Sequence, residues 1–213
     1  MTNSSLNAVN FGNILKRAVE SFNPGHLAHA SQRRVPENKL VEHIRTELLR
    51  KPNTQVAKHF SHKYDYFGEI TFLYQPGVDL FVGYNGFLHG VEVKLPTEKN
   101  NFVFYKGADE VLAHSTYGLD FSWIIHFYPI GYVNWYSYQK WMEYTIKHSR
   151  CPSIGYIVAT TKSCELCVCP TKPFSRSLQV DKDLKEAVSY IRNKLTGKLE
   201  KSARFVKKGE KNA

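Results

Sequence analysis

Long apolar runs are missing from this chain of 213 residues, and no stretch approaches the roughly 20 residues that a membrane-spanning helix requires. The first five residues contain no basic segment leading into an apolar run, so no secretory leader is expected. Internal repeats and low-complexity linkers are also absent, which argues against a second domain. We therefore expect a soluble, cytoplasmic protein with a single domain over residues 1–197.

Cysteine is scarce, and the four residues are Cys151, Cys164, Cys167 and Cys169. The Cys-x-x-Cys-x-Cys run suggests a zinc site, but on a strand Cys167 and Cys169 share one face while Cys164 takes the other. Because that arrangement suits tetrahedral binding poorly, we interpret the four residues as small, buried apolar side chains. Structural zinc, and a disulfide under oxidising or hyperthermophilic conditions, are the alternatives.

Acidic residues are outnumbered, since 19 Asp and Glu stand against 29 Lys and Arg and the formal net charge is +10. This excess predicts a polyanionic partner, because Lys and Arg that neutralise phosphates release counterions. No segment combines a basic face with the broad apolar face that binding to a membrane surface requires. Part of the charge lies in residues 198–213, which we interpret either as a flexible solubilising tail or as an arm that contacts nucleic acid.

The most informative segment is residues 76–95, which has the pattern of a β-hairpin. Asn85-Gly86 is a strong turn signal, because both central positions of the favoured two-residue turn need a positive φ. With that turn, Tyr84 lies opposite Phe87, Val82 opposite His89, Leu80 opposite Val91, and Asp79 opposite Glu92.

Alternation of apolar and polar residues supports this register. One face of the hairpin collects Val78, Leu80, Val82, Val91, Val93 and Leu95. Asp79, Glu92 and Lys94 converge on the other face. Opposed side chains lie about 5 Å apart, and like charges there destabilise a sheet. A divalent cation between the two acids would remove that repulsion.

An Asp, a turn and a Glu-x-Lys triplet on the next strand resemble the catalytic core of the PD-(D/E)XK nuclease superfamily, which includes type II restriction enzymes and archaeal Holliday junction resolvases. The resemblance covers about residues 38–128. Gly77-Val78 precedes Asp79 where the family has a proline, and Pro76 lies three residues before the acid. In size, basicity and layout the chain is also similar to small nucleases of this superfamily from archaeal spindle-shaped viruses.

The resemblance implies an α/β fold with a restriction-endonuclease-like core, a central mixed β-sheet flanked by helices. It implies Mg²⁺, with Mn²⁺ as a substitute, bound by Asp79, Glu92 and the carbonyl of Val93. Lys94 would orient or deprotonate the attacking water. The implied partners are duplex or branched DNA and a second copy of the chain, in the host-cell cytoplasm if the protein is viral.

Two groups of basic residues are expected to contact DNA: Arg33 and Arg34 in the loop over residues 23–37, and Lys99 and Lys106 shortly after the hairpin. The superfamily often adds a further acid from the helix before the hairpin. Residues 38–50 have an apolar stripe of helical spacing, formed by Leu40, Val41, Ile44 and Leu48. Glu47 flanks this stripe and is the preferred acid; Glu42 lies nearly opposite the stripe and is the second choice.

The remaining segments are assigned from apolar spacing and turn residues. Helices are predicted over 5–22, 105–115, 138–148 and from Asp181 or Asp183 to Gly197; strands are predicted over 66–74, 123–128, 154–160 and 164–169. Leu6, Val9, Ile14, Ala18 and Phe22 are expected to face inward, and Ser137 to cap the helix that follows it.

Residues 127–144 are unusually aromatic: Phe127, Tyr128, Tyr132, Trp135, Tyr136, Tyr138, Trp141 and Tyr144. Core packing is the first interpretation of this run, a dimer interface the second, and stacking on unpaired bases the third. Two functions therefore stay open for the chain. One is a Mg²⁺-dependent DNA endonuclease, with selectivity for branched or junction structures as an open option. The other is a catalytically silent nucleic-acid-binding protein with a nuclease-like fold.

Overall fold

The structure is a computed structural model, and it describes residues 3–22, 37–58, 78–95, 107–114, 118–128, 135–149 and 151–174. Four helices are described: α1 (Asn3–Glu20), α3 (Glu37–Leu49), α4 (Ala108–Ala113) and α5 (Trp135–His148). The strands are β1 (Thr54–Lys58), β2 (Leu80–Tyr84), β3 (Phe87–Lys94), β4 (Phe121–Tyr128), β5 (Ile154–Thr160) and β6 (Cys164–Val168). Several predictions lie outside the described residues: the strand 66–74, the helix ending at Gly197, the tail 198–213, and Arg33, Arg34, Lys99 and Lys106.

The six strands form one mixed sheet in the order β1-β2-β3-β4-β5-β6. Neighbours are antiparallel from β1 to β3 and again between β5 and β6, whereas β3, β4 and β5 run parallel. The parallel connections carry α4 and α5, as crossovers between parallel strands require. The C-terminal ends of β3, β4 and β5 therefore meet at one edge of the sheet.

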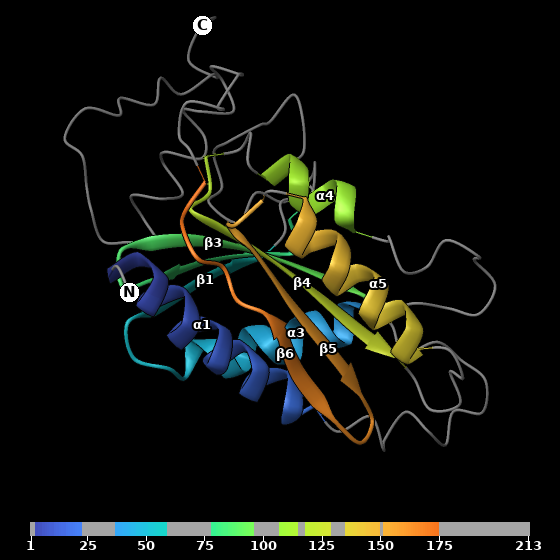
Figure 1. Cartoon of the computed structure of the whole chain (residues 1–213). Coiled ribbons are helices and arrows are strands. Elements are labelled where there is room, and N and C mark those ends of the chain that lie inside the picture. The colour runs from blue at the N-terminus through green and yellow to red at the C-terminus, as the bar shows by residue number, and fades with distance from the viewer. Residues whose placement is uncertain are drawn as a thin grey trace, which may run out of the picture.

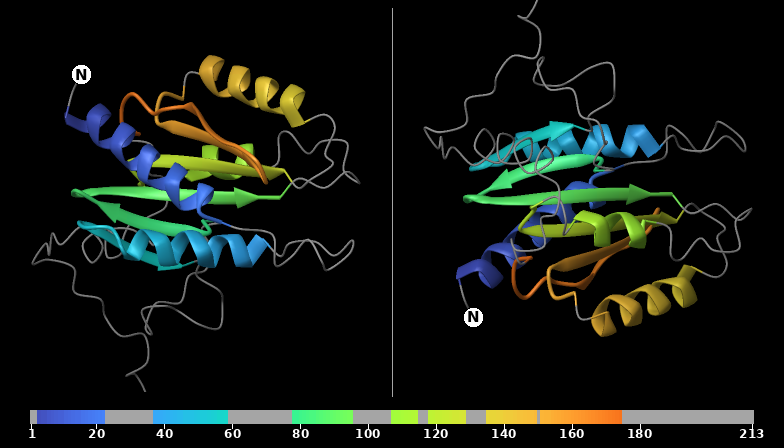
Figure 2. Two further views of the ribbon diagram at one scale, coloured as in Figure 1. Left: turned by 90° about the horizontal axis from the view of Figure 1, so that it is seen from below. Right: turned by 90° about the horizontal axis from the view of Figure 1, so that it is seen from above.

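Helices cover both faces of the sheet, so the predicted α/β class with a central mixed sheet flanked by helices is confirmed (Figure 1). α1 and α3 pack on one face, and α4 and α5 pack on the other. The two views of Figure 2 look onto opposite sides, with α1 in front of the strands on the left and α4 in front on the right. None of the helices in the described ranges is long and apolar enough to cross a membrane.

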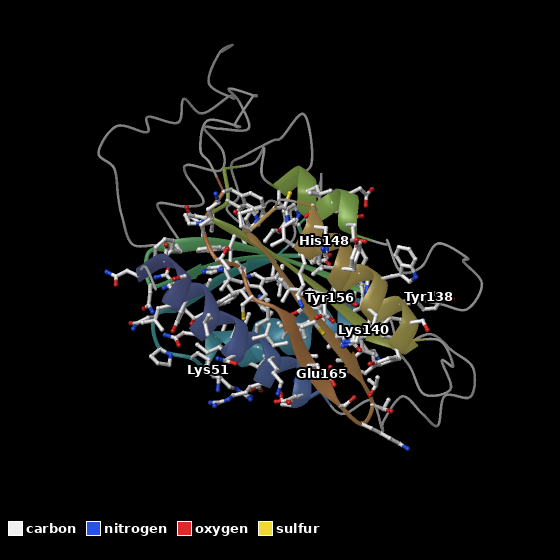
Figure 3. All side chains as sticks on the ribbon, viewed as in Figure 1. Lys51, Tyr138, Lys140, His148, Tyr156 and Glu165 are labelled. Carbon is white, nitrogen blue, oxygen red and sulfur yellow. The ribbon has the colours of Figure 1, made fainter. Side chains whose placement is uncertain are left out.

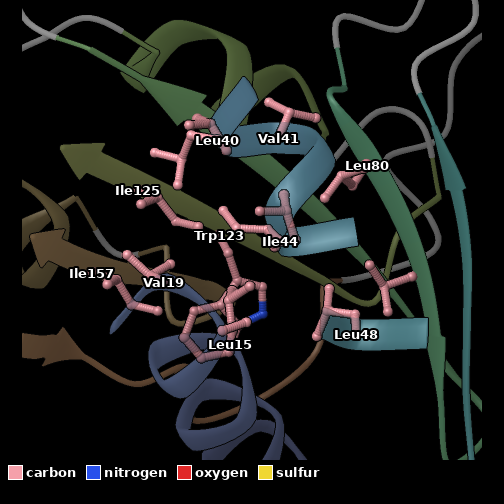
Figure 4. Close-up of a cluster of buried hydrophobic side chains, with 14 of the residues drawn as sticks. Leu15, Val19, Leu40, Val41, Ile44, Leu48, Leu80, Trp123, Ile125 and Ile157 are labelled. Carbon is pink, nitrogen blue, oxygen red and sulfur yellow. The ribbon is translucent and has the colours of Figure 1, made fainter. Parts of the chain in front are cut away.

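The larger core lies between the sheet and the pair α1 and α3 (Figure 4). The predicted stripe of α3 forms one side of it, since Leu40, Val41, Ile44 and Leu48 are all buried. Trp123 lies at the centre, fully buried, and its Nε1 donates a hydrogen bond to His89 Nδ1 at 3.2 Å. Its ring fills the space left by two glycines, Gly12 on α1 and Gly155 on β5.

The local predictions have mixed outcomes. Of the residues expected to face inward from α1, Ala18 is buried and Ile14 and Phe22 pack against the core, whereas Leu6 is half exposed. The large Phe11 and Leu15 side chains, which were not predicted to face inward, lie at the centre of the buried face. β2 pairs with Thr54–Lys58, a short polar strand that carries little apolar alternation. α5 begins at Trp135, so Ser137 lies in its first turn and does not cap it.

Candidate active site

The hairpin has the predicted register. Tyr84 pairs with Phe87 and Leu80 with Val91, and the turn residues have positive φ angles of 47° at Asn85 and 83° at Gly86. Positive φ at both central positions is the backbone geometry that an Asn-Gly turn supplies. The turn therefore fixes which residues of β3 face each side of the sheet.

Glu92 and Lys94 of β3 lie on the face that α4 covers. Both are buried, with exposed fractions of 3% and 7%. Val91 and Val93 point to the opposite face and belong to the larger core, as the alternation predicted. The sheet thus holds one acid and one lysine in a buried polar cluster rather than on a solvated surface.

Asp79 joins this cluster from the residue before β2. Its Oδ2 accepts a hydrogen bond of 2.8 Å from the backbone N–H of Val93. The carboxylate thus accepts from a backbone N–H of β3 that lies beyond the last β2–β3 pair, where a backbone carbonyl would otherwise be the acceptor. Val78 does not follow the predicted alternation: it packs near Gly90, on the Glu92 side, because the chain bends at Asp79 before β2 begins.

A second glutamate, Glu110, completes the cluster from the middle of α4. The ammonium of Lys94 forms ion pairs with Glu92 Oε1 and with Glu110 Oε2, the latter at 2.6 Å. Sequence reasoning missed Glu110 because the acid belongs to a short helix reached through a crossover. The available signal was the Asp109-Glu110 pair in the helix predicted directly after the Glu-x-Lys strand.

The pKa values of the ionisable groups in the cluster are shifted in different directions. Burial raises the pKa of Glu92 to about 10, and the negative charge of Asp79 and a hydrogen bond with Glu110 add to the rise. Burial opposes ionisation of Glu110 too, but hydrogen bonds with Glu92 and Lys94 outweigh it and lower its pKa. For Lys94 the burial penalty is exceeded by the charges of Glu92 and Glu110, so its pKa is raised. Of the two glutamates, Glu92 is therefore the one that takes up a proton more readily, and Glu110 is the one that stays ionised beside Lys94.

The donor set fits a divalent cation. Glu92 Oε2 is buried and receives no hydrogen bond from a donor group, since its hydrogen bond with the Glu110 carboxylate needs a proton on one of the two acids. The neighbouring charge of Asp79 disfavours a second bare carboxylate. A cation would satisfy both groups by replacing the proton of Glu92. Across the described residues, no three His, Cys, Asp or Glu side chains converge on one point. An ion here would thus be completed by the Val93 carbonyl and by water, which Mg²⁺ commonly retains.

The acids of α3 lie differently from the prediction. Glu47 pairs with Arg50 and Glu42 pairs with Arg45, in both cases along α3. The helix residue near the cluster is Glu37, whose Oε2 accepts a 3.4 Å hydrogen bond from the N–H of Leu95. Ten residues of helix separate Glu37 from Glu47, or about 15 Å. α3 runs from the C-terminal end of β3 towards the hairpin turn, so Glu47 lies far from the cluster.

The cysteines are all free thiols in the described chain. Cys164 packs against the larger core and its thiol donates to the carbonyl of Lys16 on α1. Cys167 packs on the opposite face, where Gln139 of α5 donates to its sulfur. Burial raises the pKa of both thiols, to about 12 and about 11, which makes them inert nucleophiles at neutral pH.

Comparison with known proteins adds no identification. No protein-family model matches the chain, and neither the curated proteins nor the solved structures include a similar one. The site is therefore interpreted from its own chemistry.

Gly107, the N-cap residue directly before α4, allows this helix to approach Lys94. Its φ is +85°, and a Cβ built there would lie 3.1 Å from Lys94 Cε and 3.0 Å from Ile124 Cδ1. We expect Gly107→Ala to lower the free energy of unfolding by about 2–3 kcal/mol, from the left-handed backbone and the crowding together.

Gly86→Ala is the matched control, because Gly86 has nearly the same φ, 83°, but lies in the hairpin turn. The control should cost about 1–2 kcal/mol in urea denaturation. Equal losses in the two variants would show that contact with Lys94 contributes nothing.

Proposed function

We propose that this protein is a divalent-metal-dependent DNA endonuclease that hydrolyses phosphodiester bonds. One observation carries the proposal: a buried Glu92 with an unsatisfied oxygen, placed beside Asp79 and ion-paired to Lys94. Two carboxylates and an ammonium at one point are the residue types that this chemistry uses. Hard oxygens hold Mg²⁺ or Mn²⁺, and the lysine offsets charge on the phosphate.

The chain's own residues have separate tasks in this mechanism. Asp79 and Glu92 would hold the ion, with the Val93 carbonyl as a third protein ligand. The bound ion would polarise the phosphate and lower the pKa of a water molecule. Lys94 donates hydrogen bonds towards the phosphate or the attacking water, and Glu110 keeps its ammonium charged and oriented.

Two further features support the proposal. The order helix, hairpin, helix, strand in α3, β2–β3, α4 and β4 is the layout that the resemblance to PD-(D/E)XK nucleases implies. The formal charge of +10 suits a polyanionic substrate. Action on branched DNA such as Holliday junctions, and a homodimer that presents two sites to two strands, are part of the same proposal.

The second candidate is a catalytically silent nucleic-acid-binding protein. Its support is the self-neutralised cluster: Lys94 pairs with both glutamates, so a proton on Glu92 satisfies the site without an ion. Such a cluster would serve as a structural element between β3 and α4. The same experiment separates the two candidates.

The test is cleavage of supercoiled plasmid and of a four-way junction in Mg²⁺, in Mn²⁺ and in EDTA. We expect metal-dependent cleavage by the wild type and its loss in Asp79→Asn. Glu20→Gln is the matched control, since Glu20 lies on the exposed end of α1 and pairs with Lys16. Equal cleavage by Asp79→Asn and wild type would remove this cluster from the mechanism. Binding without cleavage in every metal would favour the silent protein.

A further inference from the structure

The outward side of α5 carries three large aromatic side chains in contact with solvent. Tyr136, Trp141 and Tyr144 are 58%, 56% and 59% exposed, far above the other aromatic residues of the core. Core packing, the first interpretation of this aromatic run, therefore fails for these three. The name "α5 face" is used here for Tyr136, Lys140, Trp141, Tyr144, Lys147 and His148.

Lysine and histidine side chains alternate with the rings on the α5 face. Lys140 lies over the ring of Tyr136, with its Nζ 5.5 Å from the ring centre. One turn further on, His148 stacks on Tyr144 with 3.9 Å between ring centres. Figure 3 shows Lys140 and His148 along the same helix. Residues four apart lie on one side of a helix, so Tyr136 and Tyr144 are about 12 Å apart on one stripe.

The composition of this face favours nucleic acid over a second protein. Its exposed residues include no aliphatic side chain. Aromatic side chains suit either partner, but lysine is depleted at protein–protein interfaces and is enriched where phosphates bind. Lys140 and Lys147 share one partner, Glu143, at 3.2 and 2.5 Å, so the three charges leave one net positive charge.

Helix α5, whose outward side carries the α5 face, packs over the strand row that contains Lys94 of the candidate active site. Lys94 of β3 pairs with His126 of β4, and His126 pairs with Val158 of β5. Glu165 of β6 continues this row, and Gln139, on the buried side of α5 that faces the sheet, donates to its Oε2 at 2.9 Å. Three strand spacings separate Lys94 from Glu165, or about 14 Å. Both sites also lie on the same side of the sheet, the side that α4 and α5 cover.

We propose that the α5 face binds an unpaired stretch of nucleic acid, whose bases stack on Tyr136, Trp141 and Tyr144, and that it leads this strand to the Asp79–Glu92–Lys94 cluster. The inference rests on the proposed function in taking nucleic acid as the ligand. It adds a preference for substrates with single-stranded segments, such as branch points or flaps. Stacking is tolerant of base sequence, since every base has a π face.

The test measures binding of a short fluorescent oligothymidylate and of a duplex of equal length to the full chain in EDTA, which prevents cleavage. We expect Trp141→Ala/Tyr144→Ala to weaken oligothymidylate binding by about tenfold for each ring and duplex binding much less. Trp141→Phe/Tyr144→Phe keeps the rings and should retain most of the affinity. Lys140→Gln/Lys147→Gln should reduce the salt slope by about 0.7 for each lysine.

Leu6→Ala/Leu49→Ala is the matched control, because these side chains are 50% and 48% exposed on α1 and α3, across the sheet. Unchanged oligothymidylate binding in Trp141→Ala/Tyr144→Ala overturns the inference. If, in addition, the wild type sediments as a dimer and Trp141→Ala/Tyr144→Ala sediments as a monomer, the α5 face is a protein interface. Cleavage that depends on Asp79 would leave the proposed function standing in that case. Conversely, if binding depends on the rings but no metal supports cleavage, the proposed binding by the α5 face stands and the proposed nuclease activity is contradicted.

Discussion

Replacing Glu92 by glutamine is expected to abolish cleavage and to stabilise the metal-free protein. Loss of the carboxylate removes a proposed ligand of the ion and should lower the cleavage rate by about a thousandfold. The same change removes an ionisable group from a buried position beside Asp79, where burial and like charge raise its pKa to about 10. We expect the free energy of unfolding in EDTA at neutral pH to rise by about 1 kcal/mol or more.

The pH dependence of stability gives an independent check on Glu92. Its pKa is about 10 in the folded protein against 4.5 for an unperturbed glutamate, so between these values the folded state holds a proton that the unfolded state lacks. This contribution to stability is complete below pH 4.5 and is lost as the pH rises towards 10. Urea denaturation across this range should show a smaller decline in Glu92→Gln than in the wild type. Parallel declines in the two proteins would mean that the pKa of Glu92 is not raised by folding. Glu20→Gln is the control and should match the wild type throughout the pH range.

Gly155→Ala is expected to cause the largest loss of stability from a single added methyl group. A Cβ at this position would overlap Trp123, whose ring also lies against Gly12, where a Cβ would be 2.6 Å from Cη2. The indole cannot move aside, since its N–H donates a hydrogen bond to His89 in the middle of the core. We expect a loss of about 3 kcal/mol in the free energy of unfolding, measured by urea denaturation.

A double-mutant cycle tests the cause of that loss. Trp123→Leu is destabilising by itself because a large buried ring is removed. In that background the methyl group of Gly155→Ala has space, so the second change should cost little. An unchanged cost would show that Gly155 is required for its backbone and that the ring contact is irrelevant.

The hairpin could be predicted because its determinants are local. The Asn85-Gly86 turn sets the register, and alternation then decides which side Glu92 and Lys94 face. The apolar stripe of α3 was predictable for the same reason, since period and burial agree. Local patterns of this kind need no knowledge of distant partners.

The parts that sequence reasoning missed depend on how elements pack. Glu110 reaches Lys94 only because Gly107 lets α4 lie close to β3, and no pattern in the sequence reports that distance. The position of Glu47 depends on the direction in which α3 crosses the sheet. β1 escaped detection because Thr54–Lys58 is a short polar strand at the end of the described sheet, held by backbone pairing and with Val56 packed in the core.

The strictly sequential strand order has a consequence for how this protein is made. Because each strand pairs with the next one described along the chain, the partner that a new strand joins has already been synthesised. The sheet can lengthen strand by strand as the chain leaves the ribosome. Asp79, Glu92, Lys94 and Glu110 can meet before α5 is synthesised. The core over α1 closes last, because this first helix also packs against β5 and β6.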